Sequence, residues 1–115
     1  MSLLAHVHEE HEGDVPVAVI EGEIDASNSE LVGSRLRALL SNRSSALIVD
    51  LGPTAYLDSA GINLLFALGA ELGQRQQRLL LVVPEGSPLG RAIAITGLDQ
   101  AVPTHATRAA ALEQV

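Results

Sequence analysis

Two aspartates and a serine are the side chains best placed to do chemistry in this sequence. Asp58 and Ser59 are adjacent, and Asp25 lies in an earlier turn. A serine beside carboxylates suggests a hydrolase of the Gly-x-Ser-x-Gly class. Two residues before Ser59 this sequence has Leu57 instead of glycine, although Gly61 follows two residues after it, so the motif is absent. Asp25 and Asp58 can also act as paired carboxylates, yet the sequence shows no acid–base pocket around them. We therefore expect no intrinsic catalysis.

These side chains are predicted to lie at one edge of a sheet. The apolar run that ends at Asp50 is typical of a buried parallel strand, and a short loop then leads to Asp58 and Ser59, where a helix begins. Ser59 is a natural N-cap for that helix. Sites in open α/β sheets gather outside the carboxyl ends of the strands. Gly61 leaves the backbone of the first helical turn uncovered, so we expect another surface to approach there.

Three histidines near the N-terminus raise the question of a metal site. His6 and His8 would share one face of a strand, where a Zn²⁺ ion can use imidazoles, and His11 follows. A solvated strand face that runs into a hairpin is the favoured interpretation, and we expect no metal. His105 is isolated. The chain has no cysteine, which excludes disulfides, thiol nucleophiles and cysteine-based metal sites.

Alternating and β-branched segments predict the strands. Ala5 and Val7 alternate with His6 and His8, as in a half-buried strand. Further strands are expected over 15–20, 46–51, 79–83 and 101–105, with a hairpin connection over 9–14 and a loop over 52–54.

Capping signals and helical spacing predict four helices. Ser27 to Glu30 matches a capping box, and the helix that follows ends around 41–44. A second helix spans 60–76. A third starts at Ser87-Pro88 and runs to about residue 95, with Gly97 as its C-terminal cap, and a fourth spans 107–114. The order β-β-α-β-α-β-α-β-α predicts an α/β fold, one domain over 1–115 with a mainly parallel sheet of about five strands and four helices.

The helix over 60–76 is apolar on almost every side. Its core-facing stripe can be formed by Ile62, Leu65, Phe66 and Leu72. Leu64 and Leu68 then fall on another face. They form either an exposed patch for a partner or a surface covered by a neighbouring helix, and the sequence leaves both open.

Composition limits the partners. Hydrophobic residues make up 47% of the 115 residues and aromatics only 2%, so the core must be aliphatic. The net charge is −7 and the seven basic residues are scattered arginines, which argues against nucleic acid and favours a partner with a basic surface. No apolar run is long enough to span a membrane and the N-terminus lacks signal-peptide features, so we expect a cytoplasmic protein with no membrane partner.

The run from Asp50 through Tyr56-Leu57-Asp58-Ser59-Ala60-Gly61-Ile62 resembles the signature of the STAS domain, in particular that of bacterial anti-sigma factor antagonists. Upstream, Gly22-Glu23-Ile24-Asp25 resembles the second landmark of the family. The predicted order of strands and helices matches the family over essentially the whole chain, so the resemblance implies a single STAS domain.

The resemblance implies a regulatory cycle. Ser59 corresponds to the serine that a partner anti-sigma factor phosphorylates, with ATP and Mg²⁺ bound to that kinase and no cofactor on this chain. Unphosphorylated, the domain would bind the kinase and free a sigma factor, and a phosphatase would reset the switch. Ala60 replaces the second Ser or Thr of many relatives, which leaves Ser59 as the candidate in the motif. The expected partner-binding residues are Asp25, Asp58, Ala60, Gly61, Ile62, Leu64 and Leu68.

Two alternatives belong to other classes. The chain can be a STAS interaction subunit of a signalling scaffold or a lipid-transport complex that works without phosphorylation, with Ser59 serving only the helix start. The loops around Asp25 and Ser59 can also bind a small ligand, although they lack a phosphate-cradling glycine-rich loop.

Overall fold

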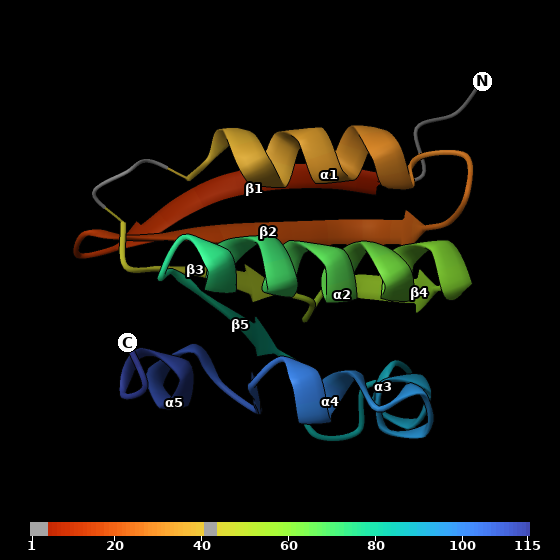
Figure 1. The fold of residues 1–115 in the computed structure, drawn as a ribbon. Coiled ribbons are helices and arrows are strands. Elements are labelled where there is room, and N and C mark those ends of the chain that lie inside the picture. The colour runs from red at the N-terminus through yellow and green to blue at the C-terminus, as the bar shows by residue number, and fades with distance from the viewer. Residues whose placement is uncertain (1–4, 41–43) are drawn as a thin grey trace.

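The structure is a computed structural model that describes residues 5–40 and 44–115. The described residues form six strands, which are β1 (Ala5–Glu12), β2 (Val15–Ile24), β3 (Ala46–Asp50), β4 (Thr54–Leu57), β5 (Arg78–Val82) and β6 (Thr104–His105). They also form five helices, which are α1 (Ser29–Ala38), α2 (Ser59–Gln74), α3 (Gly90–Thr96), α4 (Leu98–Ala101) and α5 (Arg108–Leu112). Figure 1 shows their arrangement.

The strands form one mixed sheet in the order β1-β2-β3-β5-β6. β1 and β2 form an antiparallel hairpin whose turn includes Gly13 at a φ of +62°. The remaining pairings are parallel, because helices connect most of the later strands. The predicted α/β class with a mainly parallel sheet is confirmed.

β4 was missed by the sequence prediction, which placed a loop there. It runs parallel to β2 beyond the part of β2 that pairs with β3, so two short strands share one long neighbour. The buried Thr54 hydroxyl donates a hydrogen bond of 2.6 Å to the carbonyl of Ile20. The segment does not alternate, since Thr54 and Leu57 are buried and both residues between them are exposed, so it carries no periodic strand signal. β4 brings Leu57 and Asp58 to the carboxyl end of β2.

Other elements differ from prediction at their ends. The strand expected over 101–105 is only β6, because a one-turn helix, α4, follows α3. α2 ends at Gln74 instead of residue 76. α3 begins at Gly90, three residues after the predicted start at Ser87, and the Ser87 hydroxyl accepts a hydrogen bond from the amide of Leu89 before the helix. Gly97 does end α3, at a φ of +78°. α1 ends at Ala38, earlier than the end predicted around 41–44, of which 41–43 lie outside the described residues.

The predicted capping box at α1 is wrong. Asn28 occupies the N-cap position, and its side chain forms no capping bond to the helix. Its carbonyl oxygen instead accepts from the amide of Asp25, and its amide group donates to the carbonyl of Glu23. The Ser27 hydroxyl donates to the Asp25 carboxylate. The short polar side chains bind the turn before the helix, a competing use that such residues often find.

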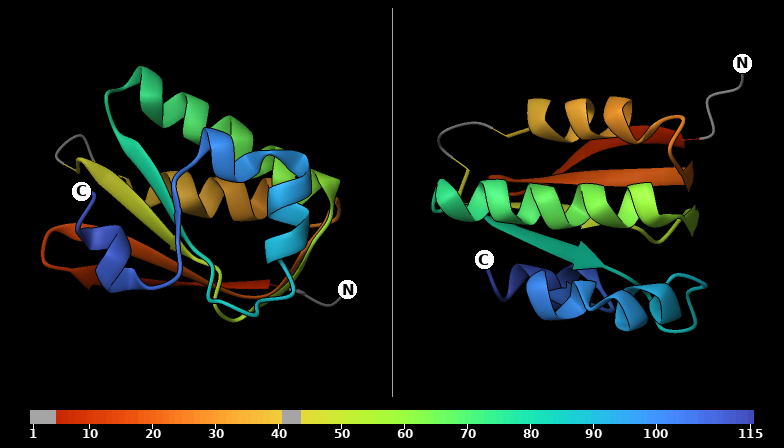
Figure 2. Two further views of the ribbon diagram at one scale, coloured as in Figure 1. Left: turned by 90° about the horizontal axis from the view of Figure 1, so that it is seen from below. Right: turned by 45° about the vertical axis from the view of Figure 1, so that its right-hand side comes forward.

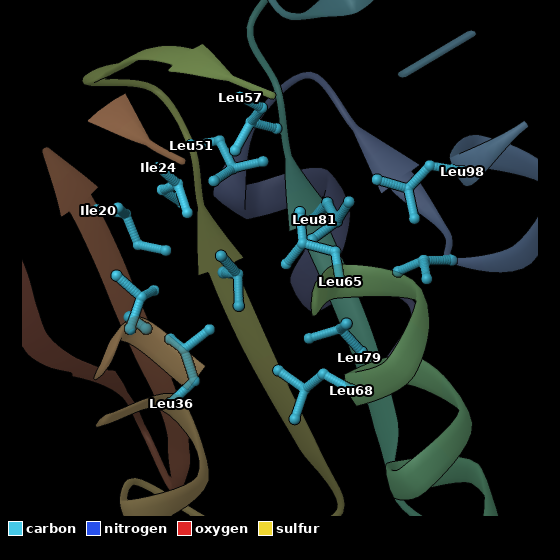
Figure 3. Packing of buried hydrophobic residues seen from close by; sticks show 14 of the residues in the cluster. Ile20, Ile24, Leu36, Leu51, Leu57, Leu65, Leu68, Leu79, Leu81 and Leu98 are labelled. Carbon is cyan, nitrogen blue, oxygen red and sulfur yellow. The ribbon is translucent and has the colours of Figure 1, made fainter. Parts of the chain in front are cut away.

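Apolar side chains form two clusters, which pack against the sheet. Figure 2 shows the helices that accompany the sheet. Helices α1 to α4 contribute to the larger core cluster on one face, and α5 packs on the other. In Figure 3, Leu36 of α1 and Leu65 and Leu68 of α2 lie among aliphatic side chains of the sheet. The core is aliphatic, as composition requires, since Tyr56 is exposed and Phe66 only partly buried. This rigid layer sets the direction in which α2 begins.

Candidate functional site

Asp58 fixes the start of α2. Its Oδ1 accepts hydrogen bonds from the amides of Ala60 at 2.8 Å and Gly61 at 3.1 Å, and Asp58 is the N-cap residue of the helix. Its Oδ2 accepts a third bond, of 3.2 Å, from the amide of Ala26 in the β2–α1 loop. One carboxylate therefore joins two segments that are remote in sequence.

Ser59 is the first residue of α2 rather than its N-cap, so that part of the prediction is wrong. Its side chain is exposed, and it forms no hydrogen bond within the residues that the structure describes. Asp58 and Ser59 are both good N-cap residues, and only the backbone shows which one precedes the helix. The hydroxyl of Ser59 is left free to meet another molecule.

Asp25 lies in the loop that Asp58 holds. Its Oδ1 accepts hydrogen bonds from the hydroxyl of Ser27 at 2.5 Å and from the Ser27 amide at 2.9 Å. The hydroxyl of Ser27 is the main cause that lowers the pKa of the Asp25 carboxyl below its ordinary value. Asp25 therefore stays ionised at neutral pH. It directly precedes Ala26, whose amide donates to the Asp58 carboxylate. The structure thus brings the two predicted acidic positions together.

Gly61 does not leave the backbone open, contrary to the sequence interpretation. A Cβ at this position would lie 3.0 Å from Leu57 Cδ2 and 3.2 Å from the carbonyl oxygen of Ile24. Gly61 is buried, and the first turn of α2 packs directly against the end of β2. A larger residue here would press on Leu57 and on the backbone of Ile24, so this internal close approach favours glycine.

The expected exposed patch on α2 is also wrong. Leu68 is fully buried and Ile62 is 4% exposed, so neither reaches a partner in this conformation. Leu64 is partly buried against the core, and its Cδ1 lies only 2.8 Å from where a Cβ on Gly33 of α1 would be. The neighbouring helix covers this face, which was the other interpretation left open by the sequence.

The accessible surface around Ser59 is more polar than predicted. Asn63, one turn along α2, is exposed, and Ala60 is half-buried. Tyr56, three residues before Ser59, is 49% exposed. Sequence reasoning named neither Tyr56 nor Asn63 as a contact residue. The signal for Asn63 was its place as the polar member of an otherwise apolar helix start.

Asp50 belongs to a structural ion-pair cluster. Its Oδ2 accepts a hydrogen bond of 2.9 Å from Arg108 Nε, and its Oδ1 accepts one of 2.8 Å from the amide of Gly52. Arg108 also contacts Glu10 at 2.7 Å and Glu12 at 3.6 Å. The hydrogen bond to Asp50 is the main cause that raises the pKa of Arg108. These contacts tie α5 to β1 and β3.

Neither a metal-binding group nor a membrane-crossing helix is found where the chain is described. The rings of His6 and His8 stack with centroids 6.4 Å apart, but no set of three His, Asp or Glu side chains over 5–40 and 44–115 is placed to hold an ion. In the same ranges, each helix is too short or too polar to cross a bilayer.

The fold and the Asp58–Ser59 helix start define a class of protein. Residues 6–111 match the model of the STAS domain, and the chain belongs to the STAS domain family. The chain is 32% identical over 91 residues to the anti-sigma-F factor antagonist RsfB of Mycobacterium tuberculosis. The aligned region covers 79% of this chain and 72% of RsfB.

Solved structures agree with this assignment. The crystal structure of an anti-sigma factor antagonist from Mycobacterium paratuberculosis has a TM-score of 0.84 and 28% identity, and the match covers 96% of this chain and 93% of that one. The anti-sigma factor antagonist SpoIIAA in its unphosphorylated form shares the fold, with a TM-score of 0.73, 19% identity and 95% coverage of both chains. The resemblance to the family seen in the sequence is confirmed.

Proposed function

We propose that this protein is an anti-sigma factor antagonist controlled by phosphorylation. The unphosphorylated form binds an anti-sigma factor that is also a serine kinase and thereby frees a sigma factor, and phosphorylation of Ser59 ends the binding. The observation that carries the proposal is the exposed, unbonded hydroxyl of Ser59 at the first position of α2. The names of the relatives from the two mycobacteria support the antagonist role.

The cap geometry supports a switch that acts at the surface. Oδ1 of Asp58 already binds the amides of Ala60 and Gly61. A phosphate on Ser59 would add about −1.5 to −2 charges, and these two amides would not be free to receive it. The helix dipole still tolerates the added charge at this end. We expect the phosphate to face outward and the fold to change little.

The charge around Ser59 favours a partner with a basic surface. Asp25 and Asp58 flank the site, and the exposed Glu23 and Glu30 lie in the same β2–α1 region. A basic kinase surface would be attracted to these carboxylates. The added phosphate would weaken binding through its bulk and through repulsion with acidic groups at the contact. A loss of about 3–4 kcal/mol corresponds to a few hundredfold in affinity.

The remaining parts of the cycle belong to the partners. The kinase would hold ATP and Mg²⁺, and a phosphatase would remove the phosphate from Ser59. The chain itself would need no cofactor, because the only chemical group that it contributes is the hydroxyl. The cycle would run in the cytoplasm, where sigma factors meet RNA polymerase.

Intact-mass measurement tests the proposal. The protein is incubated with ATP, Mg²⁺ and each anti-sigma factor kinase of the same cell. We expect one added phosphate on the native protein and on Ser34→Ala, a control at an exposed serine of α1, and none on Ser59→Ala. A stable complex with a kinase but no phosphate would refute the switch and favour an unphosphorylated interaction subunit. A phosphate that persists on Ser59→Ala would place the site elsewhere.

The charge mechanism has a separate test. Ser59→Ala should bind the partner about as tightly as the native protein, whereas Ser59→Asp should bind more weakly, as measured by calorimetry. Equal affinities for the two variants would show that negative charge at this position does not control binding.

A further inference from the structure

β1 is an edge strand with an open side. It pairs with β2 on one side only, and over the described residues no strand pairs with its other side. An unpaired edge presents a row of backbone N–H and C=O groups that can bind an extended chain. In Figure 1, α1 runs beside β1 along most of its length. A chain that paired with the open edge of β1 would therefore lie next to α1.

Two hollows follow the seam between β1 and α1, with volumes of about 90 Å³ and 250 Å³. They share Val7 and Arg35 and therefore adjoin, and we call the pair the β1–α1 groove. Each hollow has an apolar part, formed by Ala5, Leu31 and Val32 in one and by Ala38 and Leu39 in the other. His6, His8 and Asn28 add polar groups to the first hollow. Leu31 is 44% exposed.

Arg35 supplies the positive charge of the groove. Its side chain is exposed at the junction of the two hollows and forms no ion pair within the described ranges. The other arginine of α1, Arg37, is held by Glu71 at 2.8 Å. Glu9, which also lines the groove, contacts His11 at 3.4 Å. Arg35 is thus a guanidinium without an ion pair, set between two partly apolar hollows.

We propose that the β1–α1 groove binds an extended segment of a partner protein, which adds to β1 as a further strand. Alternate side chains of a strand point to one side and are about 6.6–6.8 Å apart. An apolar residue would fill each hollow, and an acidic residue between them would meet Arg35. The segment therefore has the pattern apolar–x–acidic–x–apolar. Strand addition beside a helix is an established way to bind peptides, in which the backbone supplies affinity and the hollows supply specificity.

Charge favours such a partner over a second copy of this chain. β1 carries Glu9, Glu10 and Glu12, and the whole chain has a net charge of −7. Pairing two copies through β1 would bring these carboxylates and two acidic domains together. The segment proposed here places its carboxylate against Arg35 instead. The inference does not depend on phosphorylation of Ser59.

A labelled peptide tests the groove. The probe is fluorescein-Ser-Val-Thr-Glu-Thr-Val-Ser, followed by anisotropy and by amide signals of the ¹⁵N-labelled protein. We expect saturable binding, with shifts concentrated in β1 and α1. Arg35→Glu should weaken binding by at least about tenfold, because it replaces attraction by repulsion. Arg91→Glu, the same charge change at an exposed position of α3, should leave the affinity unchanged.

Two altered probes test the mode of binding. A peptide with Lys in place of Glu should prefer Arg35→Glu over the native protein. A peptide whose strand-pairing amides are methylated should lose binding, since it cannot donate to β1.

Several results would overturn the proposal. These are the absence of saturable binding up to about 1 mM peptide, equal effects of Arg35→Glu and Arg91→Glu, and shifts centred on the start of α2. Concentration-dependent dimerisation that shifts the β1 signals without peptide would identify a second copy as the occupant instead.

Discussion

Replacing Gly61 by alanine tests the close packing beneath the candidate site. The added Cβ would lie 3.0 Å from Leu57 Cδ2 and 3.2 Å from the Ile24 carbonyl oxygen, where ordinary contacts are 3.4 Å or longer. Leu57 is 5% exposed and Ile24 is fully buried, so neither can move aside freely. Overpacking of this kind costs about 1–3 kcal/mol.

The better helix propensity of alanine offsets at most about 1 kcal/mol of that cost. We expect Gly61→Ala to lose up to about 2 kcal/mol net, roughly a decrease of up to 8 °C in Tm for a domain of this size. Thermal unfolding, monitored by circular dichroism, measures the decrease in Tm, and urea titration measures the loss in unfolding free energy. Gly73→Ala in the same helix is the matched control, because a Cβ there meets no atom within 4 Å. It should gain up to about 1 kcal/mol. Equal shifts in the same direction for both variants would refute the packing argument.

Three further predictions concern the polar network. Asp58→Ala should cost about 1–2 kcal/mol in urea unfolding, because three amides lose their acceptor. The folded pKa of Asp25 lies below its ordinary value of 3.8, so its ionised form stabilises the fold above that pH, and the contribution is lost as pH falls through the lower folded value. The urea midpoint of Asp25→Asn should therefore fall less steeply in acid than that of the native protein, and parallel curves would contradict this. Arg108→Leu should cost about 1–3 kcal/mol, since it leaves the 14% exposed carboxylate of Asp50 without its partner, and adding Asp50→Asn should recover part of the loss.

Periodicity was sufficient to predict the class of fold. The alternation around Ala5 and Val7 predicted a half-buried strand, and the continuous apolar run over 46–51 predicted a buried parallel strand; both are present. β4 and α4 have four residues each and carry no periodic signal that distinguishes them from loops. Their existence depends on contacts with remote segments, such as the bond between Thr54 and Ile20.

The candidate site was located correctly along the chain but not in its details. Asp58 and Ser59 are both suited to the N-cap, and only the backbone decides between them. The exposure of Leu68, which is buried, was left open, because a helix that is apolar all round does not reveal which side its neighbours cover. Arg108 binds Asp50 across 58 positions, a pairing for which a single sequence gives no signal.

The small helix α5 has a consequence for the handling of fragments. It shields the second apolar face of the sheet, to which Val17, Ile48, Leu80 and Val82 contribute from the central strands. A fragment cut before Arg108 would expose β-branched and leucine side chains on adjacent strands, a composition prone to intermolecular association. The carboxylates of Glu10, Glu12 and Asp50, freed from Arg108, would then remain at the margin of that face as charged gatekeepers against aggregation.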